Sequence, residues 1–373
     1  MLSVAFRAAT GVSVGRMGIL MSAGAFGAIV GMLPAGFAHD RMGSRVATVL
    51  AGSWALVGLG GLGVFLPRGF WPLLILVFLV GSALPALSLV GLGSVSTLFQ
   101  GTRHEGLALG VRQASAPLGG VLAASLLPWL GHVWPLQRVF LALSVNLALW
   151  TVILTVFLPV RRAISAPRSS LRLRHLFVHV RGALWTSFLL APGQYALLTY
   201  VIFDLHDKAG RHPVAAGLLL AVALLSGLLS RLVLGSVHDR GVAVTRLLRL
   251  AAGVGATSLL LWAGLPRDLP LTALVLIFMA LGAGVDGWNA LLTAWLAEKS
   301  RTAERGLGLA LVGMAGLFGV IVWIPVLGIL QRVCHSYRPG WVVVATLYAL
   351  AAFTLARPAT PSSGRLTPRA PGP

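Results

Sequence analysis

Charged residues are scarce in this sequence. Only 10% of the 373 residues are Asp, Glu, Lys or Arg, and nine of these are acidic. Hydrophobic residues make up 57%, more than a water-soluble domain of this size needs for its core. We therefore expect a membrane protein whose first partner is the lipid bilayer.

Cysteine and clustered metal ligands are also lacking. The single cysteine, Cys334, can form no intramolecular disulfide. The nine histidines lie mostly singly in predicted loops, whereas a metal site needs clustered ligands. No GxxxxGK[ST] phosphate loop and no hydrolase elbow are present. We expect no metal, no cofactor, no catalytic residues and no enzymatic activity.

The net charge of +20 raises the question of nucleic acid as a partner. Of the 29 basic residues 27 are Arg, and they are scattered among loops without interleaved aromatic residues, which argues against nucleic acid. Their excess on one side of the predicted membrane instead places the central linker and the C-terminal tail in the cytoplasm. The predicted location is the cell membrane.

Apolar runs follow one another almost end to end. A bilayer core of roughly 30 Å takes about 20 helical residues, and these runs are rich in Leu, Ala, Gly and Val rather than alternating, which disfavours a barrel. The predicted fold is all-α, a multi-pass helical bundle of eleven spans, near residues 17–38, 46–66, 72–99, 107–131, 139–160, 184–204, 214–237, 247–265, 269–297, 306–330 and 341–356.

The longest polar interruption follows the fifth span. Its sequence, RRAISAPRSSLRLRHLFVHVR, is rich in Arg and contains Pro and Ser, a composition typical of a linker. The tail is Pro-rich and polar, which predicts disorder. The expected units are an N-terminal half over 1–160, a cytoplasmic basic linker over 161–183, a C-terminal half over 184–356 and a disordered tail over 357–373.

Three landmarks recur at nearly the same offset along the chain. Asp40 and Asp239 follow apolar runs, in GFAHDR and GSVHDR, and are 199 residues apart. Glu105 and Glu304 open EGLALG and ERGLGL at the same offset, and LPWLG returns as IPVLG 197 residues later. A fixed offset that covers six helices predicts two halves of one construction, as in transporters built from parallel repeats.

These segments carry a resemblance to the major facilitator superfamily. GFAHDRMGSR, residues 36–45, resembles the family's cytoplasmic loop signature G-x-L-a-D-R-x-G-R-R, with Ala38 and Ser44 as departures. GVRQASAPLGG, QYALLTY, SRLVLGSVHDR and GWNALLTAWLAE resemble family helices five, seven, eight and ten, so the likeness covers essentially the whole chain. The Arg-Gln and GWN forms are similar to members that handle small anions, such as the cyanate and nitrate-like carriers.

The family has twelve helices, whereas this sequence predicts eleven. FRAATGVSVGRMG, residues 6–18, resembles the external loop before family helix two. The resemblance therefore implies that the first family helix has no counterpart here. We expect a start codon set too late, or a truncated gene.

The resemblance implies a cytoplasmic gate at the repeated motif. Asp40 is expected to latch onto the positively charged start of the helix near Gly306, and Asp239 onto the matching start near Gly106. The alternative is that both acids are polar termini that fix topology. Arg231 is expected to join Asp239 in a cytoplasmic cluster. The residues assigned to the gate are Gly36, Asp40, Arg41, Gly43, Arg45, Gly235, Asp239, Arg240 and Arg231.

Asp286 lies near the middle of the span over 269–297, where an unpaired carboxylate is costly. Asn289 and Thr293 follow at i+3 and i+7, so the three side chains share one helix face, with Gly282 a turn earlier. This pattern predicts a polar stripe along a cavity, as the resemblance implies for family helix ten. Asp286 is expected to take up and release a proton; a structural hydrogen bond to a neighbouring helix is the alternative.

Two further groups are assigned to the transport path. Gln194, Tyr195 and Thr199 lie in the segment that resembles family helix seven, where they could bind a solute or make interhelical hydrogen bonds. Arg112 and Gln113 stand about five residues inside a helix start. For Arg112, contact with Asp286 or a substrate anion competes with snorkelling to the membrane surface.

These observations predict a secondary transporter that moves a small solute, an anion among the candidates, by alternating access with protons as the coupling ion. A monomer is expected. One alternative is a proton-driven antiporter that exports drugs or metabolites. Another, from a different class, is a membrane scaffold or sensor that has the same fold and transports nothing.

Overall fold

The computed structural model describes residues 3–66, 69–99, 105–158, 173–266, 269–299 and 305–356. Over these ranges the chain forms helices and no strand. The helices are α1 (Ser3–Thr10), α2 (Val14–Phe65), α3 (Phe70–Phe99), α4 (Glu105–Val133), α5 (Leu136–Phe157), α6 (Leu173–Ala209), α7 (Pro213–Asp239), α8 (Val244–Gly264), α9 (Leu271–Asp286), α10 (Trp288–Lys299), α11 (Arg305–Cys334) and α12 (Arg338–Ala356).

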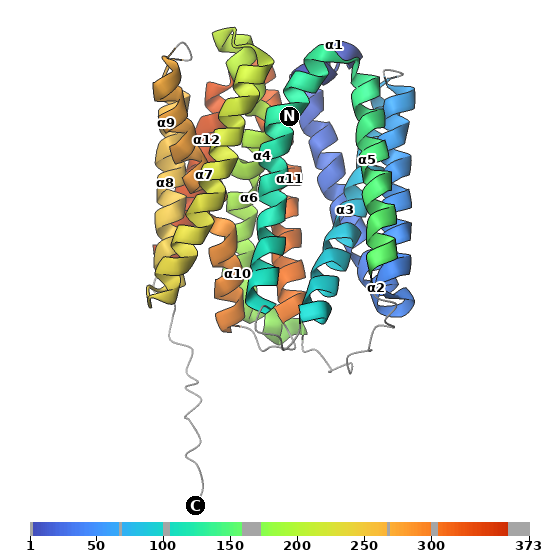
Figure 1. Ribbon diagram of the computed structural model, residues 1–373. Coiled ribbons are helices and arrows are strands. Elements are labelled where there is room, and N and C mark those ends of the chain that lie inside the picture. Colours follow the sequence, from blue (N-terminus) through green and yellow to red (C-terminus); the bar gives the residue numbers. More distant parts are fainter. Residues whose placement is uncertain are drawn as a thin grey trace, which may run out of the picture.

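The long helices lie side by side, and the short helix α1 lies at one end of the bundle (Figure 1). We call α1 to α5 the N half and α6 to α12 the C half. The end at which α5 stops and α6 starts is the linker face, and the opposite end is the α1 face. α2, α3 and α5 lie on one side, α7, α8, α9 and α12 on the other, with α4, α6 and α11 between them (Figure 1).

The contacts between the halves have the symmetry that the repeat predicts. The offset of 199 residues relates α2 to α7 and α4 to α11. In the structure α2 packs against α11, and α4 packs against α7. Exchange of the two halves converts one contact into the other, which confirms the prediction of two related helical units.

Membrane-crossing segments agree closely with the expected spans. Ten helical segments of the described chain are long and apolar enough to cross a membrane, and Phe70–Pro85 is a shorter apolar segment. In the segment Val180–Asp207 of α6, 78% of the most apolar window is buried, against 17% in the segments of α4 and α5. α6 is therefore the most buried helix, whereas the spans of α4 and α5 have much less of their surface covered by protein. α6 begins eleven residues before the predicted span at 184.

The motif expected to be a loop, residues 36–45, has helical backbone within α2. Gly31 lies so close to Ser82 that a Cβ would touch its backbone, and Trp54 donates a hydrogen bond through Nε1 to Ser82 Oγ at 2.7 Å. A straight helix would hold residues 31 and 54 about 35 Å apart. α2 must therefore reverse direction between them. The prediction of two spans is confirmed, and the reversal of the chain that connects them lies between residues 31 and 54.

α7 and α9 approach each other backbone to backbone. A Cβ at Gly282 would meet the backbone of Ala223, and one at Gly227 would lie 2.7 Å from Asp286 Cβ. Ser226 and Ser230, one turn apart on α7, donate hydrogen bonds to the carbonyls of Met279 (2.7 Å) and Ala283 (3.0 Å) on α9. Small residues thus hold the two helices at the short separation that membrane helices use in place of apolar burial.

The contact between α7 and α9 gives a stability test. Gly282→Ala should lower the melting temperature of the purified protein, because the added methyl group meets backbone and overpacking costs about 1–3 kcal/mol. Gly253→Ala is the matched control: a Cβ there meets nothing within 4 Å, and alanine is the better helix former. Equal melting temperatures for the two variants would contradict the packing described.

Candidate functional site

A cavity of about 480 Å³ lies between the two halves, and we call it the central cavity. Residues of α4, α6, α7 and α10 form its walls. The lining residues are Ala114, Ala116, Gln194, Leu228, Arg231, Leu232, Asn289, Ala290 and Thr293. Those on α4, α7 and α10 lie within eleven residues of the ends of their helices at the linker face, so the cavity is nearer that face.

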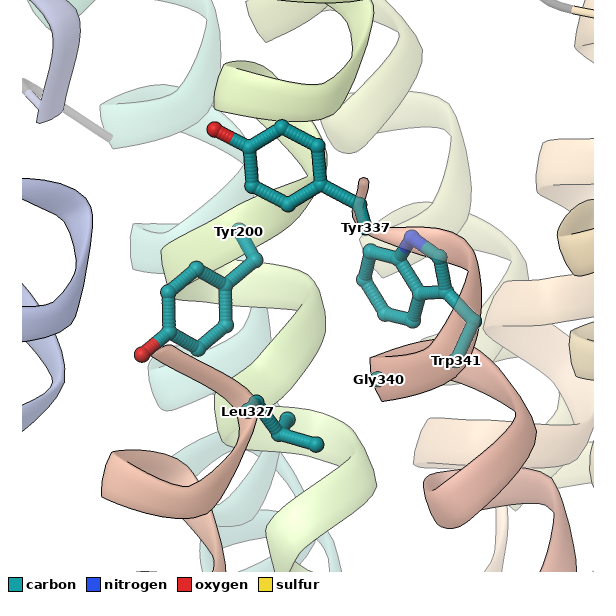
Figure 2. Close-up of a pocket in the computed structure, with 5 residues that line it drawn as sticks. All are labelled: Tyr200, Leu327, Tyr337, Gly340 and Trp341. Atoms are coloured by element: carbon teal, nitrogen blue, oxygen red, sulfur yellow. The ribbon is translucent and has the colours of Figure 1, made fainter. Parts of the chain in front are cut away.

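A second hollow, near the α1 face, has a volume of only about 10 Å³, enough for one water molecule at most. Figure 2 shows Tyr200, Tyr337 and Trp341 around it, with Leu327 and Gly340. The polar tips of the aromatic side chains are already used: Tyr200 donates to Ile324 O at 2.9 Å, and Trp341 donates to Asp204 Oδ2 at 2.7 Å. This hollow is therefore packing space rather than a solute site.

The central cavity is bordered by a buried ion pair. Arg231 Nη2 donates to Asp286 Oδ2 at 2.6 Å, and Arg231 Nε donates to the backbone carbonyl of Asp286 at 2.9 Å. The Asp286 side chain is 3% exposed and that of Arg231 is 17% exposed. Arg231 lines the cavity and Asp286 does not, so Arg231 is the member of the pair that a solute in the cavity would meet.

The second carboxylate oxygen of Asp286 is less well satisfied. Oδ1 is buried and has no hydrogen-bond partner among the described residues. A buried ion that lacks a full set of partners is costly. Arg231 is therefore the main partner of the Asp286 carboxyl group, and its removal would leave that buried group without a compensating charge.

The helix that carries Asp286 is interrupted next to it. The predicted span over 269–297 is divided at Gly287 into α9 and α10. Side chains bind the carbonyls at this break: Trp288 Nε1 donates to Val285 O at 2.8 Å, and Tyr348 OH donates to the same oxygen at 2.9 Å. Gly287 itself keeps helical dihedral angles, with φ −69° and ψ −22°, so α9 and α10 form one membrane span.

Gln194 and Asn289 form a weak amide pair on the wall that faces the cavity. Asn289 Nδ2 lies 3.5 Å from Gln194 Oε1 and 3.4 Å from Asp286 O. Thr293, one turn further along α10, donates to Asn289 O at 3.1 Å and is exposed. Of the predicted stripe, Asn289 and Thr293 line the central cavity, whereas Asp286 does not and is paired with Arg231.

Arg231 is the main correction to the sequence-based assignment. It was expected in a cytoplasmic cluster with Asp239, but it pairs with Asp286. Asp239 is eight residues later on α7, about 12 Å further along the axis and on a different face. A charged residue within a predicted span, such as Arg231, is a sequence signal for a functional site. No pattern in the sequence indicates which acidic residue Arg231 pairs with.

Only some of the other residues predicted for the transport path line the central cavity. Gln194 lines the central cavity, whereas Tyr195 and Thr199 are absent from its walls; Thr199 is 3% exposed. Arg112 binds Ser88 O at 3.1 Å and Ser115 Oγ at 3.3 Å; of the alternatives considered for it, contact with Asp286 is not observed, and its role in the transport path stays a prediction. The side chain of Gln113 lies outside the described part of the structure.

The gate residues are described only in part. The side chains of Gly36, Asp40, Arg41 and Gly43 lie outside the described residues, so the latch at Asp40 stays a prediction. Arg45 is described, and its Nε donates to Leu158 O at 2.5 Å at the end of α5, a contact within the N half. Gly235, Asp239 and Arg240 lie at or near the end of α7, and neither Asp239 nor Arg240 forms a salt bridge with another described residue.

Comparison with known families decides the class of the chain. A sequence model described as the Major Facilitator Superfamily matches residues 1–324. The chain belongs to the Major Facilitator Superfamily. This confirms the resemblance inferred from the repeated motif and identifies the protein as a multi-pass membrane protein rather than an enzyme. Within the described residues, no three His, Cys, Asp or Glu side chains gather where they could hold a metal ion.

Two curated members of the superfamily show the degree of likeness. An uncharacterized MFS-type transporter of Mycobacterium tuberculosis is 27% identical over 270 residues, which is 70% of this chain and 58% of that protein. The 3-(3-hydroxy-phenyl)propionate transporter of Escherichia coli is 28% identical over 258 residues, which is 66% of this chain and 61% of that protein. The chain thus spans less than two thirds of the length of these relatives.

Solved structures of superfamily members share the fold. A D-xylose–proton symporter superposes with a TM-score of 0.75 at 15% identity, with 95% of this chain and 92% of that chain covered. The nucleoside transporter NupG gives 0.70 at 15% identity, with 95% and 92% covered. The xylose transporter XylE from E. coli, in its inward open conformation, gives 0.70 at 14% identity, with 97% and 92% covered.

The buried ion pair can be tested by its effect on stability. Arg231→Leu and Asp286→Leu should each lower the melting temperature strongly, because removing one partner of a buried pair costs about 3–5 kcal/mol. The double variant should lose far less melting temperature than the two single variants together, because it leaves no uncompensated charge. Asp239→Leu serves as control, because Asp239 is an exposed acidic residue on α7, the helix that carries Arg231. Additive losses in the double variant would show that the two side chains do not depend on each other.

Proposed function

We propose that the protein is a secondary transporter that moves a small organic anion across the membrane by alternating access, with protons as the coupling ion. The observation that carries this proposal is that Arg231 both pairs with the buried carboxylate of Asp286 and lines the central cavity. A guanidinium in this position supports anion binding, because its planar donors match a carboxylate.

The character of the central cavity favours an organic solute over an inorganic ion. Its volume of about 480 Å³ falls within the range of small-molecule sites, about 300–1,000 Å³. Leu228, Leu232 and three alanines offer an apolar wall, and Gln194, Asn289 and Thr293 offer a polar one. The name of the E. coli relative, a 3-(3-hydroxy-phenyl)propionate transporter, agrees with an anion that has an apolar body and a second polar group.

Proton coupling would follow from competition for Arg231. When a substrate carboxylate engages Arg231, Asp286 loses the cation that stabilises its ionised form, and a buried acid without a partner takes up a proton. When the proton leaves on the other side, the restored Asp286 carboxylate reclaims Arg231 and the substrate is released. Each anion would thus cross with a proton, which makes the protein a symporter in this proposal.

The location and orientation are part of the proposal. The distribution of arginines favours the cell membrane, with the linker face and the C-terminal tail in the cytoplasm. The motif around Asp40 and its copy around Asp239 would then act as the cytoplasmic gate, and the protein would work as a monomer. Two alternatives remain: export in exchange for protons, and a scaffold or sensor that transports nothing. The transport test distinguishes both from uptake.

The transport test uses purified protein in liposomes and labelled 3-(3-hydroxyphenyl)propionate as the first probe. The wild type should accumulate the anion when the interior is alkaline, and D-xylose and uridine should not accumulate. Asp286→Asn, a neutral copy of the protonated acid, should lose gradient-driven accumulation by at least about tenfold but retain exchange of internal for external anion. Arg231→Gln should lose both activities.

Thr346→Ala is the matched control, since Thr346 is exposed on α12 and bonds only to Val342 O of its own helix. It should transport as the wild type does. Undiminished accumulation by Asp286→Asn would refute coupling through this acid. Accumulation only with the opposite gradient would indicate export, and the absence of transport for every anion tested would favour the scaffold or sensor.

A further inference from the structure

The outward side of α8 carries two arginines at the end of the helix near the linker face. α8 lies at the outer edge of the bundle (Figure 1), and its buried side packs against α9, α10 and α12. Arg246 and Arg249 are exposed and lie in the first two turns of α8. Within the described part of the structure, neither guanidinium group has a hydrogen-bond or ion-pair partner. Two positive charges are therefore presented on the outer surface.

An apolar stripe continues from these arginines along the same side of α8. Positions three or four residues apart share one side of a helix, and the exposed positions of α8 follow this spacing from Arg246 onward. Thr257 lies on the stripe, but its hydroxyl donates to carbonyls of its own helix at 3.0 and 3.1 Å. The large apolar members are Leu250, Val254, Leu260 and Leu261, which are 37–58% exposed. In a multi-pass membrane protein this side of the helix contacts lipid chains.

The matching helical segment of the N half lacks these arginines. Residues 46–55 of α2 and 246–255 of α8 have the same order of exposed and buried positions at an offset of 200 residues, apart from position 253, which is half-buried. Leu50 and Leu250 are equivalent in this comparison. Val46 and Val49, which are 45% and 42% exposed, stand at the places of Arg246 and Arg249. The shared architecture therefore has no need of a cation at these two positions.

The two arginines are also poorly placed to stabilise α8 itself. A helix start carries partial positive charge, which disfavours cations there, and α8 has no acidic residue in its first turn. Residues 240–265 include three arginines and no acid. Asp239, the nearest acid along the chain, is exposed and forms no salt bridge with a described residue. An anionic group at the membrane surface would offset the local excess of positive charge.

We propose that Arg246 and Arg249 bind the head group of an anionic phospholipid, with an acyl chain along the stripe from Leu250 to Leu261. Arginine suits a phosphate because its planar donors form two parallel hydrogen bonds. Arg246 and Arg249 are one turn apart on one helix face, so both guanidinium groups can reach a single head group. Leu250 is one turn, about 6 Å, further along the axis than Arg246, where the acyl chains begin. A ligand that matches both parts must combine a negative head with an apolar tail.

The test measures lipid binding to the purified protein in neutral detergent by native mass spectrometry. Phosphatidylglycerol is the anionic probe, and phosphatidylcholine with the same acyl chains is the zwitterionic control. Arg246→Gln and Arg249→Gln should each weaken binding of the first phosphatidylglycerol about fivefold, and the double variant about thirtyfold, because an arginine at an anionic lipid surface contributes about 1 kcal/mol. Binding of phosphatidylcholine should not change.

Two further variants make the test specific to this site. Arg332→Gln/Arg338→Gln removes the same number of charges from exposed positions at the α1 face, and it should bind phosphatidylglycerol as the wild type does. Val46→Arg/Val49→Arg copies the two arginines onto the matching surface of the N half. This variant should bind a second phosphatidylglycerol with an affinity similar to that of the first.

Unchanged binding of phosphatidylglycerol by Arg246→Gln/Arg249→Gln would overturn the site. An equal loss in Arg332→Gln/Arg338→Gln would also overturn it, since net charge alone would then explain the effect. The absence of a second bound lipid in Val46→Arg/Val49→Arg would show that two arginines above an apolar stripe do not make such a site. Because the lipid lies outside the central cavity and the readout is lipid binding, this proposal and anion transport can fail independently.

Discussion

A carboxylate in the middle of a membrane helix must have a partner, and this requirement shapes the region around Asp286. Arg231, on α7, is this partner: it donates hydrogen bonds to the side chain and to the backbone carbonyl of Asp286. The two helices can bring these groups together only because Gly227 and Gly282 remove the side chains that would separate them. The serines of α7 then satisfy carbonyls on α9, so that close approach leaves few polar groups unpaired.

The ion pair of Arg231 and Asp286 also borders the central cavity. Asp286 is the last residue of α9, and Gly287, which has helical dihedral angles, joins it to α10 within one span. The walls of the central cavity toward the linker face include α10 and the second part of α7. At the opposite end, Arg7 forms an ion pair with Asp207. The pair of Arg231 and Asp286 is the more deeply buried of the two.

Much of the fold could be predicted because lipid allows few alternatives. Apolar runs of about 20 residues must be helices, and the offset of 199 residues between Asp40 and Asp239 indicated two related halves before any contact was known. Asp286 could be singled out because a charge within a span is costly. Arg231 was misplaced for a different reason: its partner lies 55 residues away on another helix, and helix periodicity gives the face of one helix but not its neighbour. The same limit applies to Arg7 and Asp207, 200 residues apart.

The central claim is that a solute anion and Asp286 compete for Arg231, so that binding of the anion transfers a proton to the protein. Its most direct test is proton uptake on binding, followed with a pH indicator in weakly buffered detergent solution as 3-(3-hydroxyphenyl)propionate is added to the purified protein. The account predicts saturable uptake of about one proton per bound anion by the wild type, and none by Asp286→Asn. Saturable binding without proton uptake, or equal uptake by Asp286→Asn, would contradict it.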